Sequence, residues 1–177
     1  CKVAPFDAYT LPEDIGGVFC EGYTTCRFDY DEIERNIHDV NGIPEMIKTA
    51  LAASSWEDFH GYFLEAPHAA IIAAHDSGHN SIGPTMENQD VAAFDPIFWF
   101  FHCNWDRLFW KWQQAMDATT VDGLLCTMHD ETSMQLFCVP AAGTLPPFTD
   151  GDPYVTTRDI VDSVGSLDVD YAYPEDT

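Results

Sequence analysis

Two stretches of the sequence decide the fold: HDSGHNSIGPTM at residues 75–86 and FDPIFWFFHCNWDRLFWKWQ at residues 94–113. His75 and His79 are four residues apart, so on a helix their side chains lie on one face, about one turn from each other. His102 lies inside the long aromatic stretch and must come from a second helix. The sequence therefore predicts two helices that bring three imidazoles to one place.

Three histidines delivered by two helices are typical of a metal site with open coordination positions, the arrangement that catalysis or oxygen binding requires. Spacing alone allows zinc, iron, nickel or copper. Asp106, one turn after His102, is expected either to accept from the free ring N–H of that histidine or to pair with a nearby cation, and Arg107 to hold a carboxylate in place. The alternative is that a helical histidine pair is only a hydrogen-bonded core or surface feature.

The composition indicates one globular domain and excludes several functions. The chain has 177 residues, of which 46% are hydrophobic, enough for one core and too few for two. Thirty acidic residues face seven basic ones, for a net charge of −23. Such a surface repels nucleic acid and anionic lipid, so neither partner is expected. The acidity favours a secreted, saline or acidic setting, and no apolar run is long enough to span a bilayer.

The six cysteines are consistent with an extracellular or other oxidising compartment. Two pairs bracket short loops and could form disulfides, namely Cys20 with Cys26 and Cys126 with Cys138. Cys103, in the aromatic stretch, is expected to be a buried free thiol. Cys1 has no obvious partner within the chain, and the start at Cys1 without an initiator Met or signal peptide indicates a processed or truncated N-terminus.

Periodicity predicts a mainly α domain with an irregular start and end. Residues 1–27 are expected to be irregular, residues 28–118 to form the helical core, and residues 119–177 to form loops and a short extended tail. Helices are predicted at residues 29–39, from Pro44, after a cap at Ser54 or Ser55, from Pro67 to about Gly83, and from the Asp95-Pro96 start to about Asp117. The inner face of the last helix is predicted to carry Trp99, His102, Asp106, Trp110 and Gln113.

The pattern HxxxHNxxGxxM followed by FDPIFWxxHxNxDRLxxxWQ resembles the second copper-binding half of the type 3 copper proteins: tyrosinases, catechol oxidases and molluscan hemocyanins. Two later segments are also similar to that family, LPPFTDG at residues 145–151 and the closing SLDVDYAYPE at residues 166–175, with its Tyr-x-Tyr motif. The resemblance implies a helical-bundle copper-binding core of tyrosinase type. It also implies that His75, His79 and His102 are the ligands of the second copper, CuB.

The resemblance also implies roles for three further residues. Glu65 matches the family's water-holding glutamate, one residue upstream of its usual place, and Asp76 occupies the position where an Asn in many tyrosinases helps that water take the phenol proton. A carboxylate pair beside copper is a plausible general base. Asn80 is expected to orient a ligand or the substrate. The alternative is that Glu65 and Asp76 only cap or solvate helix ends.

The chain departs from the family pattern at two points. Phe101 stands where a second His usually precedes the third ligand, which changes packing and removes no expected ligand. The three histidines of the first copper site, CuA, have no counterpart in the chain, so another chain that carries this site is the expected partner. The leftover histidines are expected to be an interior residue or ordinary polar positions: His38, His60, His68 and His129.

Three functions are compatible with these residues. The first is a tyrosinase-like copper oxidoreductase that oxidises phenols or catechols to o-quinones with O2 and needs the first-copper half. The second is a hemocyanin-like protein that binds O2 and excludes phenols. The third is a non-catalytic, acidic structural or matrix protein that retains the fold, which the charge and the missing first site favour.

Overall fold

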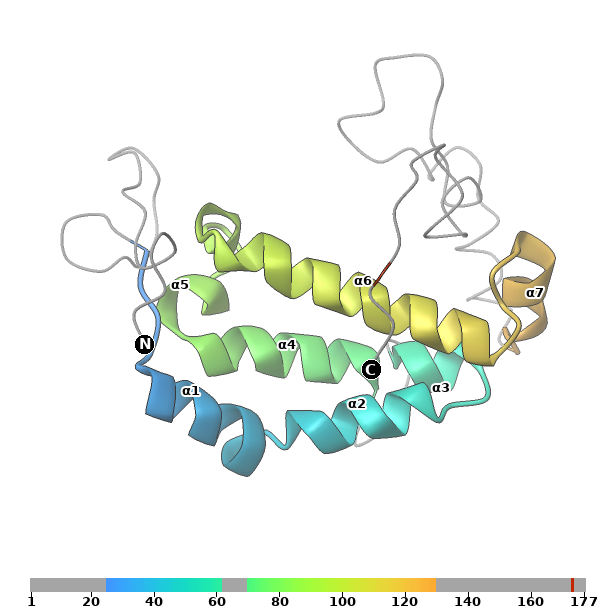
Figure 1. Cartoon of the computed structure of the whole chain (residues 1–177), viewed down its shortest axis with the longest axis horizontal. Coiled ribbons are helices and arrows are strands. Elements are labelled where there is room, and N and C mark those ends of the chain that lie inside the picture. The colour runs from blue at the N-terminus through green and yellow to red at the C-terminus, as the bar shows by residue number, and fades with distance from the viewer. Residues whose placement is uncertain (1–24, 62–69, 130–172, 174–177) are drawn as a thin grey trace, which may run out of the picture. The chain divides into compact units, whose positions relative to one another are not determined.

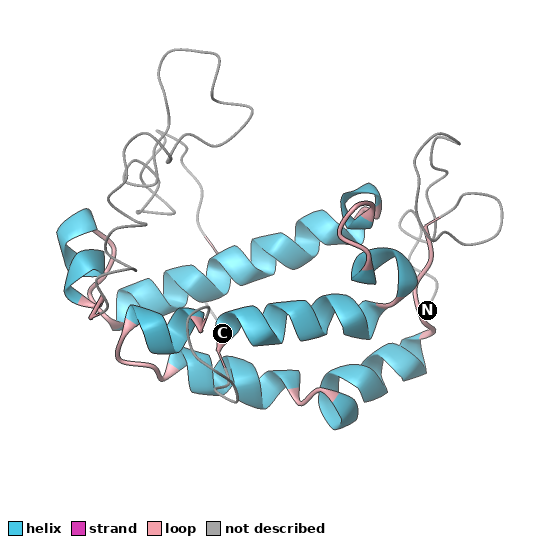
Figure 2. Cartoon of the chain, turned by 180° about the vertical axis from the view of Figure 1, so that it is seen from behind, coloured by secondary structure: helices cyan, strands magenta, loops and turns pink. Residues whose placement is uncertain are grey.

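The structure, a computed structural model, describes residues 25–61, 70–129 and 173, and its regular elements are all helices. Figure 2 shows this part of the chain without a strand, which confirms the prediction of a mainly α fold. The elements are α1 Tyr30–Arg35, the π-helix η1 Asn36–Val40, α2 Ile43–Leu51, α3 Trp56–His60, α4 Ile71–Ile82, α5 Pro84–Glu87, the 3-10 helix η2 Ala92–Phe94, α6 Ile97–Ala115 and α7 Val121–Cys126.

The chain divides into two compact units, each of which is built from two segments. One unit comprises Cys1–Ala50 and Ala69–Trp105, and the other Leu51–His68 and Asp106–Thr177. Helix α6 begins in the first unit and continues into the second. The assignment of the whole chain to a single domain stays a prediction.

In the first unit, helices begin and end where local chemistry requires it. The Asp29 side chain accepts a hydrogen bond from the Glu32 N–H and so caps α1. Gly42, at φ +59°, separates η1 from α2, a backbone conformation that suits glycine. Helix α1 and η1 pack beside α4, with α5 directly after it (Figure 1). The predicted helix at residues 29–39 is therefore present, with its last turn in π form.

Helix α4 meets the Phe101 side chain of α6 at Gly78. Ala74, Gly78 and Ser81 are buried on one face of α4. A Cβ placed on Gly78 would lie 2.8 Å from the Phe101 ring of α6, closer than carbon atoms can pack. Gly78 therefore allows the distance between the two helices on which the site depends.

In the second unit, aromatic packing anchors the end of α6. The buried Trp112 ring stacks on Phe59 of α3 with ring centroids 4.5 Å apart, and its indole N–H donates to the Ala53 carbonyl at 2.9 Å. Ser55 caps α3 by accepting from the Asp58 N–H, as predicted for Ser54 or Ser55. Gly61, at φ +78°, ends α3 in the left-handed conformation.

The predicted inner face of α6 is confirmed at Gln113, which is buried, and at His102, which joins the histidine cluster, and it is wrong at Trp99 and Asp106. Trp99 is 62% exposed and Asp106 is exposed, whereas Leu108, Trp112 and Gln113 are buried. The apolar stripe follows positions 98, 101, 105, 108 and 112, and His102 lies at its edge. Gln113 is buried because its amide donates to the Ala118 carbonyl at 3.2 Å, which satisfies the polar group.

Three further expectations are corrected by the structure. Residues Val121–Cys126 form helix α7, capped by Thr120, whose side chain accepts from the Gly123 N–H; the sequence predicted loops beyond Gly123. Cys126 is a free, exposed thiol, so it is not bridged to Cys138. Cys103 is free as expected but exposed rather than buried, because it lies on the side of α6 away from the apolar stripe.

Other predictions fall on residues outside the described part of the chain. These are the irregular segment up to residue 24 with Cys1 and Cys20, the stretch 62–69 with Glu65 and His68, and residues 130–172 with Cys138 and LPPFTDG. The structure describes one residue of the closing Tyr-x-Tyr motif, Tyr173, whose hydroxyl donates to Asp106. None of the described helices is long and apolar enough to cross a bilayer.

Gly78→Ala is expected to lower the free energy of unfolding by about 1 kcal/mol. Overpacking against Phe101 costs about 1–3 kcal/mol, and the better helix propensity of Ala returns about 1 kcal/mol. In a Phe101→Leu background, where the ring is gone, the same substitution is expected to be neutral or stabilising. Urea unfolding of the unsubstituted chain, the two single variants and the double variant measures the coupling free energy between positions 78 and 101. Additive effects of the two substitutions would contradict the close approach of Gly78 to the Phe101 ring.

Candidate metal centre

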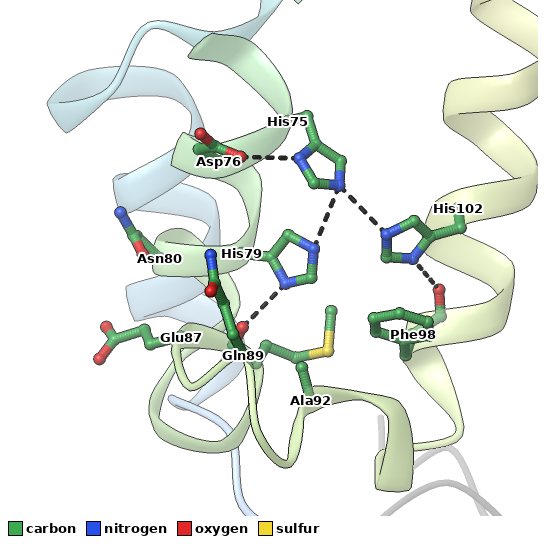
Figure 3. Close-up of a pocket in the computed structure, with 10 residues that line it drawn as sticks. His75, Asp76, His79, Asn80, Glu87, Gln89, Ala92, Phe98 and His102 are labelled. Atoms are coloured by element: carbon green, nitrogen blue, oxygen red, sulfur yellow. Dashed lines mark hydrogen bonds and ion pairs between the residues drawn. The ribbon is translucent and has the colours of Figure 1, made fainter. Parts of the chain in front are cut away.

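Three imidazole nitrogens converge between α4 and α6 in the first unit. His75 and His79 come from α4 and His102 from α6, and Figure 3 shows the three rings pointing toward one another. The Nε2 atom of His75 lies 3.1 Å from Nε2 of His102 and 3.2 Å from Nε2 of His79. Among the described residues, these histidines form the cluster that could hold a metal ion. The structure thus brings together the three residues that the sequence singled out.

The second nitrogen of each ring is held by an oxygen acceptor. Nδ1 of His79 donates to the Met86 carbonyl at 2.8 Å and Nδ1 of His102 to the Phe98 carbonyl at 2.7 Å. A backbone carbonyl can only accept, so the proton of each ring is on Nδ1. Nδ1 of His75 lies 2.8 Å from the Asp76 carboxylate. Each Nε2 therefore presents its lone pair to the common point, which is how metal-binding histidines are oriented.

The donor set and its spacing fit a transition-metal ion. Ligand nitrogens about 2.0–2.1 Å from a tetrahedral ion lie about 3.3 Å from one another, close to the 3.1 and 3.2 Å observed. Three lone pairs this close repel each other unless a cation or a proton lies between them. Imidazole ligands suit copper, zinc, iron and nickel, and three of them leave a coordination position open.

Burial keeps two of the ligands in the neutral, metal-binding form. The pKa of His79 and that of His102 are lowered from the ordinary value chiefly because burial disfavours the charged ring. The hydrogen bonds that the rings donate to the Met86 and Phe98 carbonyls raise these pKa values, and the effect of burial outweighs them. Protons therefore compete less with a metal for these two nitrogens than for an exposed histidine.

Aromatic rings close one side of the cluster. The Phe98 ring lies 3.9 Å, centroid to centroid, from His102, and Phe101 lies 4.7 Å from His79 and 5.4 Å from His75. Trp105 meets His75 edge-on with centroids 5.7 Å apart. Phe101, at the position where the family usually has a second His, thus packs against all three histidine rings. Phe101 and Trp105 pack against the imidazoles on this side, whereas Phe98 also lines the pocket described below.

An ion pair that the sequence did not predict fixes the start of α6. The Asp95 carboxylate, 1% exposed, receives Arg27 Nη2 at 2.5 Å and Nε at 2.9 Å, a bidentate geometry. The same carboxylate accepts the Ile97 N–H at 2.9 Å, which confirms Asp95 as the cap of this helix. Arg27 is 68 positions away in the sequence, and no local pattern links the two residues.

The opposite side of the cluster opens into a pocket of about 360 Å³. Polar residues on its described lining include Asp76, Asn80, Glu87 and Gln89, and Figure 3 shows Asp76 turned toward His75. Met86 and Ala92 supply apolar surface. A pocket that joins apolar walls, a few polar groups and a metal position is the usual form of a small-molecule site.

The structure changes the expected roles of the neighbouring residues. Asp106 does not reach His102, whose Nδ1 is bonded to Phe98; its carboxylate instead accepts from Tyr173. The prediction that Asp106 supports His102 is therefore wrong, because the helix's own carbonyl lies nearer to that ring. The predicted role of Arg107 in holding a carboxylate stays a prediction.

The leftover histidines that the structure describes do not join the triad. His38 is exposed, 3.9 Å from Glu34, and His129 is exposed as well. The ring of His60 stacks on Trp56 at 4.8 Å within the second unit, as expected for an interior residue. The described part of the chain thus supplies one cluster of three ligands.

Comparison with known proteins gives consistent matches to one family. The family described as "Common central domain of tyrosinase" matches residues 21–115. Polyphenol oxidase 3 of Agaricus bisporus is 32% identical over 118 residues, which are 55% of this chain and 20% of that protein. The tyrosinase of Aspergillus oryzae is 61% identical over 65 residues, 32% of this chain and 12% of that protein.

A tyrosinase of Podospora anserina is 31% identical over 105 residues, 55% of this chain and 18% of that protein. The chain thus spans about a fifth or less of the length of these relatives. No solved structure matches it.

The metal-free chain is expected to lose stability as the pH falls through about 6.5, the ordinary pKa of histidine. Below this value the unfolded chain protonates His79 and His102 while the folded chain resists, since their folded-state pKa values are lowered. Urea unfolding near pH 7.5 and about pH 5.5 measures the loss. A His79→Gln/His102→Gln double variant should lose less; an equal loss would mean that other groups cause it.

Proposed function

The chain belongs to the tyrosinase family, and we propose that it is the second-copper part of a copper oxidoreductase that oxidises phenols or catechols to o-quinones with O2. One observation carries the proposal: Nε2 of His75 lies 3.1 Å from that of His102 and 3.2 Å from that of His79, and the three ligand atoms all lie within 4.8 Å of one another. Their Nδ1 atoms are held by acceptors, so all three lone pairs face a pocket open to small molecules.

In this proposal His75, His79 and His102 hold one copper, at the position called CuB in the family. Bound copper supplies the redox chemistry with O2. The chain's own residues fix the rings: Met86 and Phe98 hold the Nδ1 protons through their carbonyls. The Phe101 ring packs against the histidine rings, and the Phe98 ring lies beside His102 at the wall of the pocket.

The second copper needs ligands beyond the described residues. His38, His60 and His129 do not form a second cluster with the described acids and cysteines. We propose that the first copper would be held by a further part of the same polypeptide or by a partner chain. The short coverage of the relatives, about a fifth of polyphenol oxidase 3, supports a longer functional protein.

The polar lining of the pocket is proposed to handle the substrate's proton. Asp76 and Asn80 lie on the described lining, next to His75 and His79 in the sequence. A carboxylate near the reacting hydroxyl can accept its proton directly or through water. Glu65, outside the described residues, is proposed as its partner by the resemblance alone. Asn80 is proposed to orient the phenol.

Two further points belong to the proposal. Six cysteines and a net charge of −23 favour an extracellular or otherwise oxidising setting. A hemocyanin-like O2 carrier would use the same copper ligands but would prevent phenols from reaching the copper. An acidic structural protein would keep the fold without oxidising phenols. Copper bound without catechol turnover would favour the carrier, and an absence of copper would favour the structural protein.

The chain is expected to bind one Cu²⁺, and His102→Ala is expected to abolish this binding because two imidazoles on one helix cannot close the site. Metal analysis after dialysis against copper gives the stoichiometry. His38→Ala is the matched control, since this exposed histidine lies on η1 and pairs with Glu34; it should retain the metal. Copper retained by the His102→Ala chain would refute the site.

Asp76→Ala is expected to reduce the oxidation of monophenols more than that of diphenols in the copper-loaded protein with its first-copper half. Only the monophenol reaction needs the additional proton acceptor. The ratio of the two initial rates, compared with the unsubstituted protein, measures the effect. Equal losses on both substrates would argue that Asp76 does not take the substrate's proton.

A further inference from the structure

We propose that Asp76 is a positioning residue for copper, which acts through His75 to favour Cu²⁺ over Cu⁺ at this site. The inference rests on the proposed copper binding and concerns a role separate from proton acceptance. It follows from an asymmetry among the three ligands: His75 is held by a charged side chain, whereas His79 and His102 are held by neutral backbone.

The contact is close and involves the nitrogen that faces away from the metal position. Oδ1 of Asp76 lies 2.8 Å from Nδ1 of His75, while Nε2 of the same ring points to the other two histidines. Figure 3 shows Asp76, His75 and His102 in one continuous row of contacts. A negative charge on one side of the imidazole is therefore relayed to the metal position on the other.

A carboxylate changes what the ring can donate. When Nδ1–H is bonded to an anion, the ring carries more electron density, and Nε2 becomes a stronger donor than in a ring bonded to a carbonyl. The divalent ion gains more from this density than the monovalent ion. The carboxylate also offsets part of the positive charge that the ion brings into the site.

The size of the effect is limited by exposure. The Asp76 side chain is 67% exposed, against 24% for His75, so water screens part of its charge. Loss of a partner of this kind typically weakens metal binding by about 10–100-fold. For Asp76 we expect a change near the lower end of this range.

Glu87 provides a matched control within the same pocket. Its side chain is exposed and lines the pocket, as Asp76 does. The Nδ1 atoms of the three histidines meet Asp76, Met86 and Phe98, so Asp76 is in contact with a histidine nitrogen and Glu87 is not one of these partners. Glu87→Gln removes one negative charge from the pocket and leaves the three Nδ1 contacts intact.

The experiment measures the affinity of the full chain for Cu²⁺, and for Cu⁺ without oxygen, by competition with chelators of known affinity. Asp76→Asn keeps an oxygen that can accept from Nδ1–H and loses the charge, whereas Asp76→Ala loses both. We expect Asp76→Asn to weaken Cu²⁺ binding about tenfold and Asp76→Ala by up to about 100-fold. Cu⁺ binding should change less in both, so that the ratio of the two affinities falls. Glu87→Gln should stay within about twofold for both ions, because its charge acts only through solvent.

Circular dichroism of each variant confirms that the helices are retained. The inference is overturned if Asp76→Asn binds Cu²⁺ as the unsubstituted chain does, or if it weakens both ions equally. It is also overturned if Glu87→Gln gives the same loss, since the effect would then be that of pocket charge in general. An unsubstituted chain that binds no copper would overturn the proposed function and this inference together, whereas normal copper binding with unchanged Asp76 variants overturns the inference alone.

Discussion

An imidazole can offer a lone pair to a metal only while its proton stays on the other nitrogen, and the described site depends on this constraint. The carbonyls of Met86 and Phe98 hold the Nδ1 protons of His79 and His102, and the Asp76 carboxylate holds that of His75. Without these acceptors each ring could rotate or change tautomer, and the three Nε2 atoms would not meet. The pocket and its polar lining can serve a metal site only when the three Nε2 lone pairs are aligned.

The alignment is maintained by packing some distance from the nitrogens. Gly78 allows the Phe101 ring of α6 to lie against α4, and this ring contacts both ligands of that helix. The buried pair of Arg27 and Asp95 fixes the start of α6 seven residues, about two helical turns, before His102. Loss of Arg27 would leave the buried Asp95 carboxylate without a counter-charge, which is strongly destabilising. The segment at Arg27 is therefore part of the support for the metal position.

Much of this arrangement could be predicted from the sequence because its signals are local. The His75–His79 spacing, the Asp95-Pro96 start and the Ser55 cap act within a few residues, and each was confirmed as a helix or a cap. The inner face of α6 could not be placed correctly, since nearly every residue from Ile97 to Phe101 is apolar and periodicity gives little contrast there. Arg27 and the backbone acceptors were missed for another reason: such contacts depend on tertiary structure and leave no pattern in the sequence.

One aromatic neighbour of the cluster has an experimental consequence. The indole of Trp105 lies 5.7 Å, centroid to centroid, from His75, and the ring packs beside Phe101 at 5.4 Å. An ion with an unpaired electron at the Nε2 atoms would be near enough to quench the emission of this indole, whereas a closed-shell ion such as Zn²⁺ would leave it bright. The protein thus contains its own optical reporter, one that distinguishes which metal is present as well as how much of it is bound.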